Sequence, residues 1–217
     1  MISLPIISLP LPKVVENKNK NLSNTGTTLS ALRTNNFCII GTDQQGTLGN
    51  KGILDVKKAY KISDHLVVTG AGSSYACETV VKLLKSAYYR YQKELELQKD
   101  ISPLLDFLQL KLIQSGGMDG ILLIATKGMN NLGETYKIYL IDPMGSASQM
   151  PLAGIGSGGD LAQGVLKEGY QEELTVSEGV ALVKKSIRVS KSVDLYSGGK
   201  SHIYVLQKDC TFELIDL

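Results

Sequence analysis

A Gly-Thr pair near the start of the chain could supply a self-contained nucleophile. Gly26 is followed by Thr27 and Thr28. Breaking the Gly26–Thr27 bond would leave Thr27 with an α-amine beside its own hydroxyl, and such an amine titrates at about pH 8. The amine could then accept the hydroxyl proton as the oxygen attacks a carbonyl. An ordinary pair of strand threonines is the alternative, because β-branched residues favour strands.

Several later residues have the chemistry to surround such a nucleophile. Asp43 ends one apolar run, Lys58 precedes another, and Gly72 follows a third. Each has an ordinary alternative as a turn cap, a solvated charge or a loop former. Three more polar residues lie in glycine-rich loops far along the chain, namely Ser157, Asp194 and Ser197.

The composition excludes several classes of function. The 217 residues suggest one domain with a sizeable core, and a net charge of +2 predicts neither nucleic-acid nor membrane binding. The three cysteines are far apart without a Cys-x-x-Cys pair, and Cys38 and Cys77 lie in apolar runs typical of buried, reduced thiols. With only His65 and His202 as histidines, a Cys/His metal site is not expected, and the reduced thiols predict a cytoplasmic protein.

The first 26 residues differ from the rest. Met1–Pro12 is apolar but broken by prolines, and the next residues are rich in asparagine and lysine. Without a basic leading region or a clear cleavage site, a secretory signal is not expected. A disordered tail and a removable propeptide both fit this composition. The domain boundary falls at Gly26/Thr27, which leaves one domain over residues 27–217.

From Thr27 onward, short strands alternate with pairs of helices. We expect strands over residues 27–33, 37–42, 59–62, 65–71, 120–126, 135–141, 203–206 and 212–215. We expect helices over residues 78–97, from Ser102-Pro103 to Gly116, over 160–170, and after the capping box Thr175–Glu178. Strands on both sides of paired helices predict an α+β protein, a four-layer α/β/β/α sandwich.

Taken together, these residues resemble the β-type subunits of the 20S proteasome, from Thr27 to the C-terminus. The matching segments are Gly26-Thr27-Thr28, Asp43, Gly49-Asn50, Lys57-Lys58, Ala71-Gly72, Gly156-Ser157-Gly158 and Asp194…Ser197-Gly198-Gly199. The helix pair around residues 164–183 is similar to that of archaeal-type β subunits. The resemblance implies an N-terminal-nucleophile hydrolase that cuts polypeptides. It also implies seven-membered β rings stacked on α rings, with a regulatory ATPase acting through the α ring.

The resemblance also assigns roles to individual residues. Removal of residues 1–26 at Gly26 would expose Thr27 as the nucleophile, and no cofactor would be needed. Lys58 would favour deprotonated neighbours, and Asp43 would keep that lysine charged. The threonine amine would be surrounded by Ser157, Asp194 and Ser197, and the backbone N–H of Gly72 would stabilise the oxyanion.

The resemblance further places the substrate as an extended strand. It would lie between the Gly46-Thr47 and Gly70–Gly72 segments, bound through main-chain hydrogen bonds. Gly70 would form the base of the pocket for the residue before the cut, and its small size predicts a roomy pocket. Glu78 occupies the place of an acid in trypsin-like β subunits, which predicts large or basic residues there. A surface glutamate on a helix is the alternative.

Departures from the family pattern leave other interpretations open. Many members begin Thr-Thr-Thr-Val-Gly, whereas this chain reads Thr27-Thr28-Leu29-Ser30-Ala31, and its Asp43–Lys58 interval is one residue shorter. Some segments resemble HslV, the simpler bacterial relative. A non-catalytic β subunit that only builds the ring is a second alternative, and an amidohydrolase acting on small amides is a third.

Overall fold

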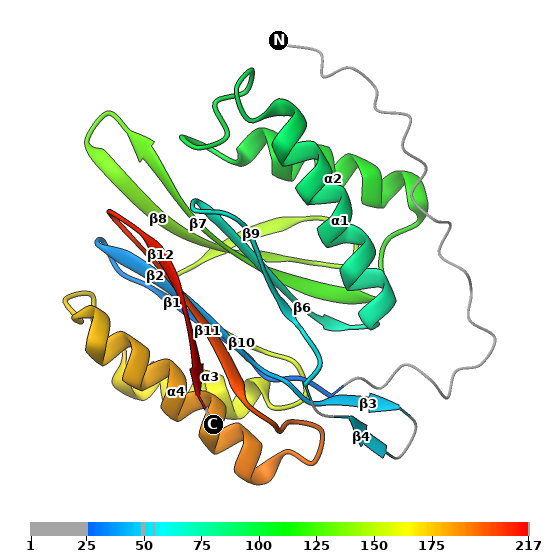
Figure 1. Ribbon diagram of the computed structural model, residues 1–217, viewed down its shortest axis with the longest axis vertical. Coiled ribbons are helices and arrows are strands. Elements are labelled where there is room, and N and C mark those ends of the chain that lie inside the picture. The colour runs from blue at the N-terminus through cyan, green and yellow to red at the C-terminus, as the bar shows by residue number, and fades with distance from the viewer. Residues whose placement is uncertain (1–25, 49–50, 54, 217) are drawn as a thin grey trace.

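The computed structural model has two facing antiparallel sheets, each covered on its outer side by two helices (Figure 1). The structure describes residues 26–48, 51–53 and 55–216. Residues 1–25, most of the expected propeptide, lie outside this range. The layer order confirms the predicted four-layer α/β/β/α sandwich.

The first sheet has the strand order β10-β1-β2-β11-β12. Its strands are Leu152–Ile155 (β10), Leu29–Arg33 (β1), Phe37–Asp43 (β2), Ser201–Gln207 (β11) and Thr211–Asp216 (β12). The second sheet has the order β5-β6-β7-β8-β9. Its strands are Ala59–Ser63 (β5), Leu66–Gly72 (β6), Gly120–Asn130 (β7), Gly133–Ile141 (β8) and Ala147–Met150 (β9). A separate hairpin pairs Gly46–Leu48 (β3) with Lys51–Ile53 (β4).

The helices cover the sheets in pairs. They are Ser74–Tyr91 (α1) and Ser102–Ser115 (α2) on the second sheet, and Gly159–Gly169 (α3) and Val176–Val193 (α4) on the first. Three buried apolar clusters separate the four layers: one under α1 and α2, one between the sheets, and one under α3 and α4. Burial of these faces drives the layering.

The helix boundaries show which sequence signals were reliable. The capping box at Thr175 and Glu178 starts α4 as predicted, and α2 ends before Gly116, whose φ of 83° suits glycine. The prediction of a helix over residues 78–97 is wrong at both ends. Helix α1 begins at Ser74, four residues before the predicted start, and the Ser73 hydroxyl caps it. At the other end, residues 92–99 form turns, in which Glu96 has a φ of 47°.

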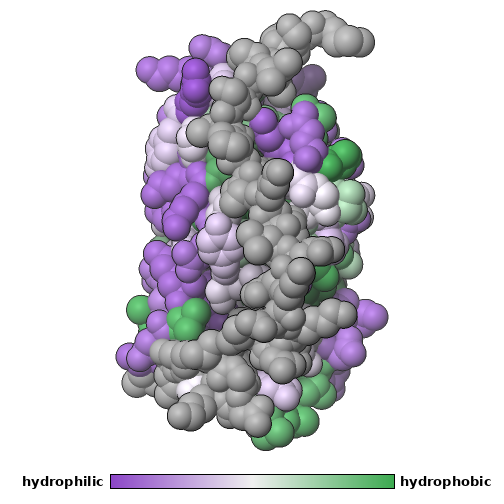
Figure 2. Space-filling model, turned by 90° about the vertical axis from the view of Figure 1, so that its right-hand side faces the viewer, coloured by the Kyte–Doolittle hydropathy of each residue, from purple (hydrophilic) through white to green (hydrophobic). Residues whose placement is uncertain are grey.

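Strands β9 and β10 were not predicted, because four residues are too few to show a clear alternation. The buried thiols of Cys38 and Cys77 agree with expectation. On the face shown in Figure 2, hydrophilic side chains dominate the described surface and apolar ones occur in separate patches. Within the described ranges, no helix is long and apolar enough to cross a membrane.

Replacing Ile187 with alanine tests how α4 packs on the first sheet. Ile187 is fully buried, and it fills the space that a side chain at Gly41 would need. We expect the variant to lose about 2–5 kcal/mol of unfolding free energy, because a cavity remains. Urea unfolding of the isolated subunit measures this loss.

The control is Val193→Ala on the same helix, where the side chain is 65% exposed. We expect this control to change the unfolding free energy by less than about 0.5 kcal/mol. Equal losses in the two variants would contradict the assignment of α4 to the core.

Candidate active site

The ends of several strands meet at one edge of the sandwich. Leu29, the first residue of β1, pairs with Thr42 of β2 on one side and with Ile155 of β10 on the other. Asp43 at the end of β2 pairs with Ser201 at the start of β11. The residues just outside these strand ends therefore come together, namely Thr27, Ser157 and Ser197.

The second sheet presents its own strand ends to the same place. Lys58 immediately precedes β5, and β6 ends at Gly72. Ala59 pairs with Thr69, which sets the start of β5 beside the end of β6. The site therefore lies between the two sheets, and both sheets supply residues to it.

Asp43 and Lys58 form a buried ion pair at the centre of the site. Lys58 Nζ lies 2.8 Å from Asp43 Oδ1, and the Asp43 side chain is 0% exposed. Three backbone N–H groups also donate to this carboxylate: Thr28 N at 2.9 Å, Gln45 N at 3.0 Å and Gly198 N at 2.9 Å. These four donors compensate for the loss of water around a buried charge.

Burial and the ion pair act in opposite directions on Lys58. Burial lowers the pKa of Lys58 below its ordinary value of 10.5, while the charge of Asp43 and its hydrogen bond raise it. Between the lowered pKa and 10.5, the folded chain therefore binds fewer protons than the unfolded chain. The contribution of Lys58 to stability rises with pH across that window.

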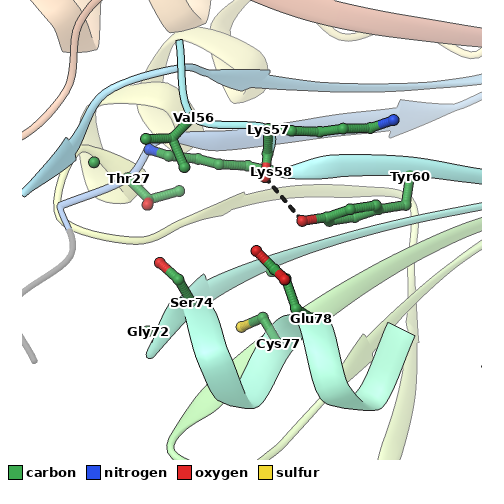
Figure 3. Close-up of a pocket in the computed structure, with 11 residues that line it drawn as sticks. Thr27, Val56, Lys57, Lys58, Tyr60, Gly72, Ser74, Cys77 and Glu78 are labelled. Atoms are coloured by element: carbon green, nitrogen blue, oxygen red, sulfur yellow. Dashed lines mark hydrogen bonds between the residues drawn. The ribbon is translucent and has the colours of Figure 1, made fainter. Parts of the chain in front are cut away.

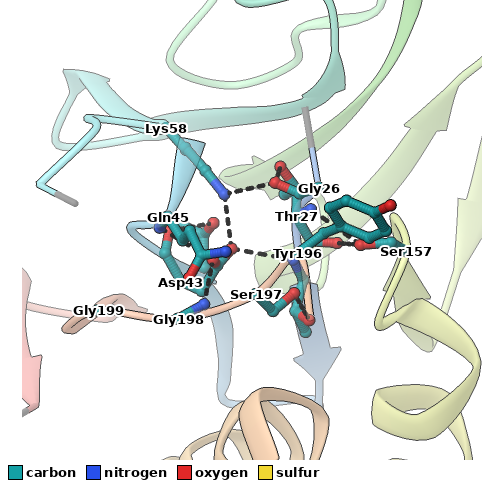
Figure 4. A network of polar contacts seen from close by, with 12 residues as sticks. Gly26, Thr27, Asp43, Gln45, Lys58, Ser157, Tyr196, Ser197, Gly198 and Gly199 are labelled. Carbon is teal, nitrogen blue, oxygen red and sulfur yellow. Dashed lines mark hydrogen bonds and ion pairs between the residues drawn. The ribbon is translucent and has the colours of Figure 1, made fainter. Parts of the chain in front are cut away.

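The carbonyl of Gly26 lies directly beside this pair (Figure 4). Its oxygen accepts hydrogen bonds from Thr27 Oγ1 at 2.6 Å and from Lys58 Nζ at 3.1 Å. Gly26 is packed against the backbone and Cβ of Tyr196, so that a Cβ added to Gly26 would lie 1.7 Å from Tyr196 Cβ. Any larger residue before Thr27 would displace this carbonyl.

A second polar cluster surrounds the Thr27 nitrogen. Thr27 N donates to Ser157 Oγ at 3.1 Å, and Ser157 Oγ donates to Asp194 Oδ2 at 2.5 Å. Ser197 Oγ donates to the same carboxylate oxygen at 2.6 Å. Helix α4 positions Asp194, its C-cap residue, whose N–H donates to Ser190 O at 2.8 Å. The Ser190 hydroxyl in turn donates to Gly158 O at 2.8 Å. The three late residues chosen from the sequence thus come together around Thr27.

Other residues predicted from the sequence line one pocket beside Thr27 (Figure 3). They are Gly46, Gly70, Gly72 and Glu78. Thr47 follows Gly46 in β3, where its backbone pairs with Gly52. The pocket has further lining residues that sequence reasoning missed, namely Val56, Lys57, Tyr60, Ser74 and Cys77.

The spacing of residues along the chain could have pointed to three of the missed residues, namely Tyr60, Ser74 and Cys77. Tyr60 lies two residues after Lys58, the strand period that places side chains on one face. Ser74, Cys77 and Glu78 are three and four residues apart, the helical period. In Figure 3 Ser74 and Glu78 point from the start of α1 toward Lys58 and Tyr60.

The pocket has a filled floor and a charged wall. A Cβ at Gly70 would lie 2.7 Å from Cys77 Sγ and 2.9 Å from Leu122 Cδ2, so the small size of Gly70 accommodates Cys77 and Leu122. Burial raises the pKa of Cys77 to about 12, which keeps it a thiol. Burial, followed by the charge of Glu78, raises the pKa of Tyr60 to about 12.

Two further contacts of the site were not foreseen. The Thr28 hydroxyl lies 2.8 Å from Ser197 Oγ, and the Gln45 amide donates to Leu195 O at 2.9 Å. No motif pointed to them, since each depends on the meeting of segments about 150 residues or more apart. In the part of the chain that the structure describes, no three His, Cys, Asp or Glu side chains form a group that could hold a metal.

This fold and site agree with the comparison to known families. The profile of the family described as "Proteasome subunit" matches residues 23–206, most of the chain and all of the site. The chain therefore belongs to the proteasome subunit family.

Its curated relatives include archaeal proteins named "Proteasome subunit beta". The protein from Methanocaldococcus fervens is 31% identical over 187 residues, covering 85% of this chain and 83% of the relative. The protein from Methanocaldococcus jannaschii is 30% identical over 187 residues, again covering 85% of this chain and 83% of the relative. That from Methanobrevibacter smithii is 27% identical over 192 residues, covering 88% of this chain and 91% of the relative.

The substitution Asp43→Asn tests the central ion pair. Without the carboxylate charge, we expect the pKa of Lys58 to fall further, because only the weaker effect of the Asp194 charge then opposes burial. An NMR titration of the lysine side-chain nitrogens measures this change. We also expect a loss of about 3–5 kcal/mol in unfolding free energy at neutral pH, because a buried pair is broken.

The matched control is Asp64→Asn, which removes the exposed partner of Lys61. Solvent screens that pair, so we expect a change within about 1 kcal/mol. An unchanged Lys58 titration in Asp43→Asn would show that Asp43 does not maintain the lysine charge.

Proposed function

We propose that this chain is the precursor of a threonine-type endopeptidase subunit of a proteasome core particle. Thr27 becomes the N-terminal nucleophile once residues 1–26 are removed. One observation carries the proposal: the carbonyl oxygen of Gly26 accepts hydrogen bonds from both Thr27 Oγ1 and the Asp43-bound Lys58. The bond that must break already lies among the groups that would break it.

The proposed processing step uses these groups on the chain itself. Thr27 Oγ attacks the Gly26 carbonyl carbon, and Lys58 stabilises the negative charge that develops on the oxygen. Loss of the C–N bond leaves an ester between the Gly26 carbonyl carbon and Thr27 Oγ. It also frees the Thr27 amine, which takes up the proton that the Thr27 hydroxyl has lost. Water then hydrolyses the ester and releases residues 1–26 with a C-terminal carboxylate.

The same atoms would then act on substrates. Thr27 Oγ attacks the peptide carbonyl, its proton passes to the new amine, and that proton is delivered to the leaving amine. Water hydrolyses the resulting acyl-enzyme. The charge of Lys58 favours the deprotonated hydroxyl, and the backbone N–H of Gly72, which lines the same pocket, is the oxyanion donor. The amine is held by Ser157, Asp194 and Ser197.

The backbone around the pocket supports the proposed class of substrate. An extended polypeptide fits between the Gly46-Thr47 and Gly70–Gly72 segments, as strand addition requires. An unfolded chain can supply such extended backbone along its whole length, which agrees with the proposed class of substrate. Glu78 on the pocket wall favours a basic residue before the cut, while Cys77 limits the depth of the pocket.

The relatives carry the name of a proteasome β subunit, and we propose the corresponding assembly for this chain. It would form seven-membered rings with other β subunits, stacked on rings of α subunits, with an ATPase acting through the α ring. A purely structural ring subunit is the alternative. Thr27, Lys58 and Asp43 are connected through the Gly26 carbonyl, and this favours an active subunit, because a ring contact needs none of their hydrogen bonds.

The substitution Thr27→Ala tests both proposed reactions. We expect assembled wild-type particles to contain a chain that begins at Thr27, and particles of the variant to retain the peptide bond after Gly26. Peptide hydrolysis should fall at least about a thousandfold, because no other group replaces the nucleophile. Mass spectrometry of the intact subunit and a fluorogenic peptide assay give the two readouts. A wild-type particle that hydrolyses peptides with residues 1–26 still attached would contradict the mechanism.

Replacing Glu78 with glutamine tests the pocket wall. We expect kcat/KM for peptides with arginine before the cut to fall about three- to tenfold, since a half-exposed carboxylate is partly screened. Peptides with leucine at that position should be cleaved as before. Glu94→Gln, on the exposed turn after α1, is the matched control. Equal effects on the arginine and leucine peptides would remove Glu78 from substrate recognition.

A further inference from the structure

A chain of polar contacts leads from the active site into the C-terminal hairpin. His202 lies on β11, and its Nδ1 is 2.7 Å from Glu213 Oε1 on β12. Its other ring nitrogen, Nε2, forms a hydrogen bond with the side-chain nitrogen of Gln44. Gln44 directly follows Asp43, so this chain of contacts ends next to the central ion pair.

The backbone of Gln44 connects two parts of the site. Its N–H donates to Gly198 O at 3.0 Å, and its carbonyl accepts from Val56 N at 2.9 Å. Gly198 belongs to the loop that also carries Ser197 and donates to Asp43. Val56 lines the substrate pocket, where it packs against Gly46. A shift of Gln44 would therefore move both the surroundings of the Thr27 amine and the pocket wall.

The side chain of Gln44 has one anchor. Gln44 is 7% exposed, and its Oε1 atom is buried without a hydrogen-bond partner among the described residues. The bond to His202 is thus the contact that fixes the amide. With Nδ1–H donated to the Glu213 carboxylate, a neutral imidazole presents the Nε2 lone pair to the Gln44 amide N–H.

We propose that His202 is a positioning residue of the active site, acting through Gln44. The inference rests on the proposed peptidase function and adds a residue that touches neither substrate nor Thr27. Glu213 orients the imidazole and fixes its tautomer, and the imidazole orients Gln44. Through its backbone hydrogen bonds, Gln44 then holds the 194–199 loop and Val56 in position relative to Asp43.

Two substitutions separate this role from simple support of the hairpin. Glutamine at position 202 extends as far as Nε2 of histidine, so His202→Gln retains a group that can bind Gln44. Asparagine extends only as far as Nδ1, so His202→Asn retains the contact with Glu213 and loses the one with Gln44. His65→Asn, at the half-buried histidine of the β5–β6 turn, is the matched control.

The assay measures kcat and KM of assembled, processed particles whose active sites have been counted by titration. We expect His202→Asn to lower kcat/KM roughly tenfold, the effect of one lost hydrogen bond, with kcat lower and KM higher. His202→Gln should recover most of the loss, and His65→Asn should match the wild type. Lost folding stability alone would reduce the number of active sites and leave KM unchanged.

Wild-type kinetics in His202→Asn would overturn the inference, and so would equal losses in the asparagine and glutamine variants. Either result, obtained with an active wild-type particle, leaves the proposed function standing. An inactive wild-type particle that retains residues 1–26 would overturn the proposed function, and the inference with it.

Discussion

The buried carboxylate of Asp43 is the constraint on which the rest of the site depends. A carboxylate without water is strongly unfavourable unless every lone pair is satisfied. Here the donors come from separate parts of the chain: Thr28 beside the proposed nucleophile, Lys58 before the second sheet, and Gly198 near the C-terminus. Satisfying one charge thus aligns segments that share no local structure.

The sandwich makes this alignment possible because both sheets end at the same edge. Asp43 ends β2 and Thr28 immediately precedes β1 in the first sheet, while Lys58 immediately precedes β5 and Gly70 lies in β6 of the second sheet. The apolar layer between the sheets keeps this edge rigid, since close-packed interiors resist small displacements. The Gly26 carbonyl contacts Lys58, and a substrate carbonyl would meet the same lysine, so one arrangement would serve both proposed reactions.

Much of this was readable from the sequence, because the signals were local or their spacing was distinctive. Thr27, Asp43 and Lys58 were chosen for their chemistry and order, and the cap at Thr175 for its pattern. The sequence could not show that Cys77 fills the space beneath Gly70, or that Gln44 meets His202. Such contacts depend on side-chain packing between residues distant in the chain, for which one sequence carries no periodicity. The early start of α1 was missed because the apolar repeat that predicts this helix begins only at Val80, more than one turn after Ser74.

The wide separation of the site residues along the chain has a consequence for folding. Thr27 N reaches Ser157, and Thr28 reaches Ser197 across 169 positions. Contacts of such sequence separation form late, after many local ones. Strand β2, which carries Asp43, pairs with β1 on one side, but its pairing with β11 on the other side waits for nearly the last strand to be synthesised. A partly synthesised chain therefore contains Thr27 and Lys58 but lacks the loop that orients them. Topology alone delays assembly of the surroundings of the proposed nucleophile until the whole domain exists.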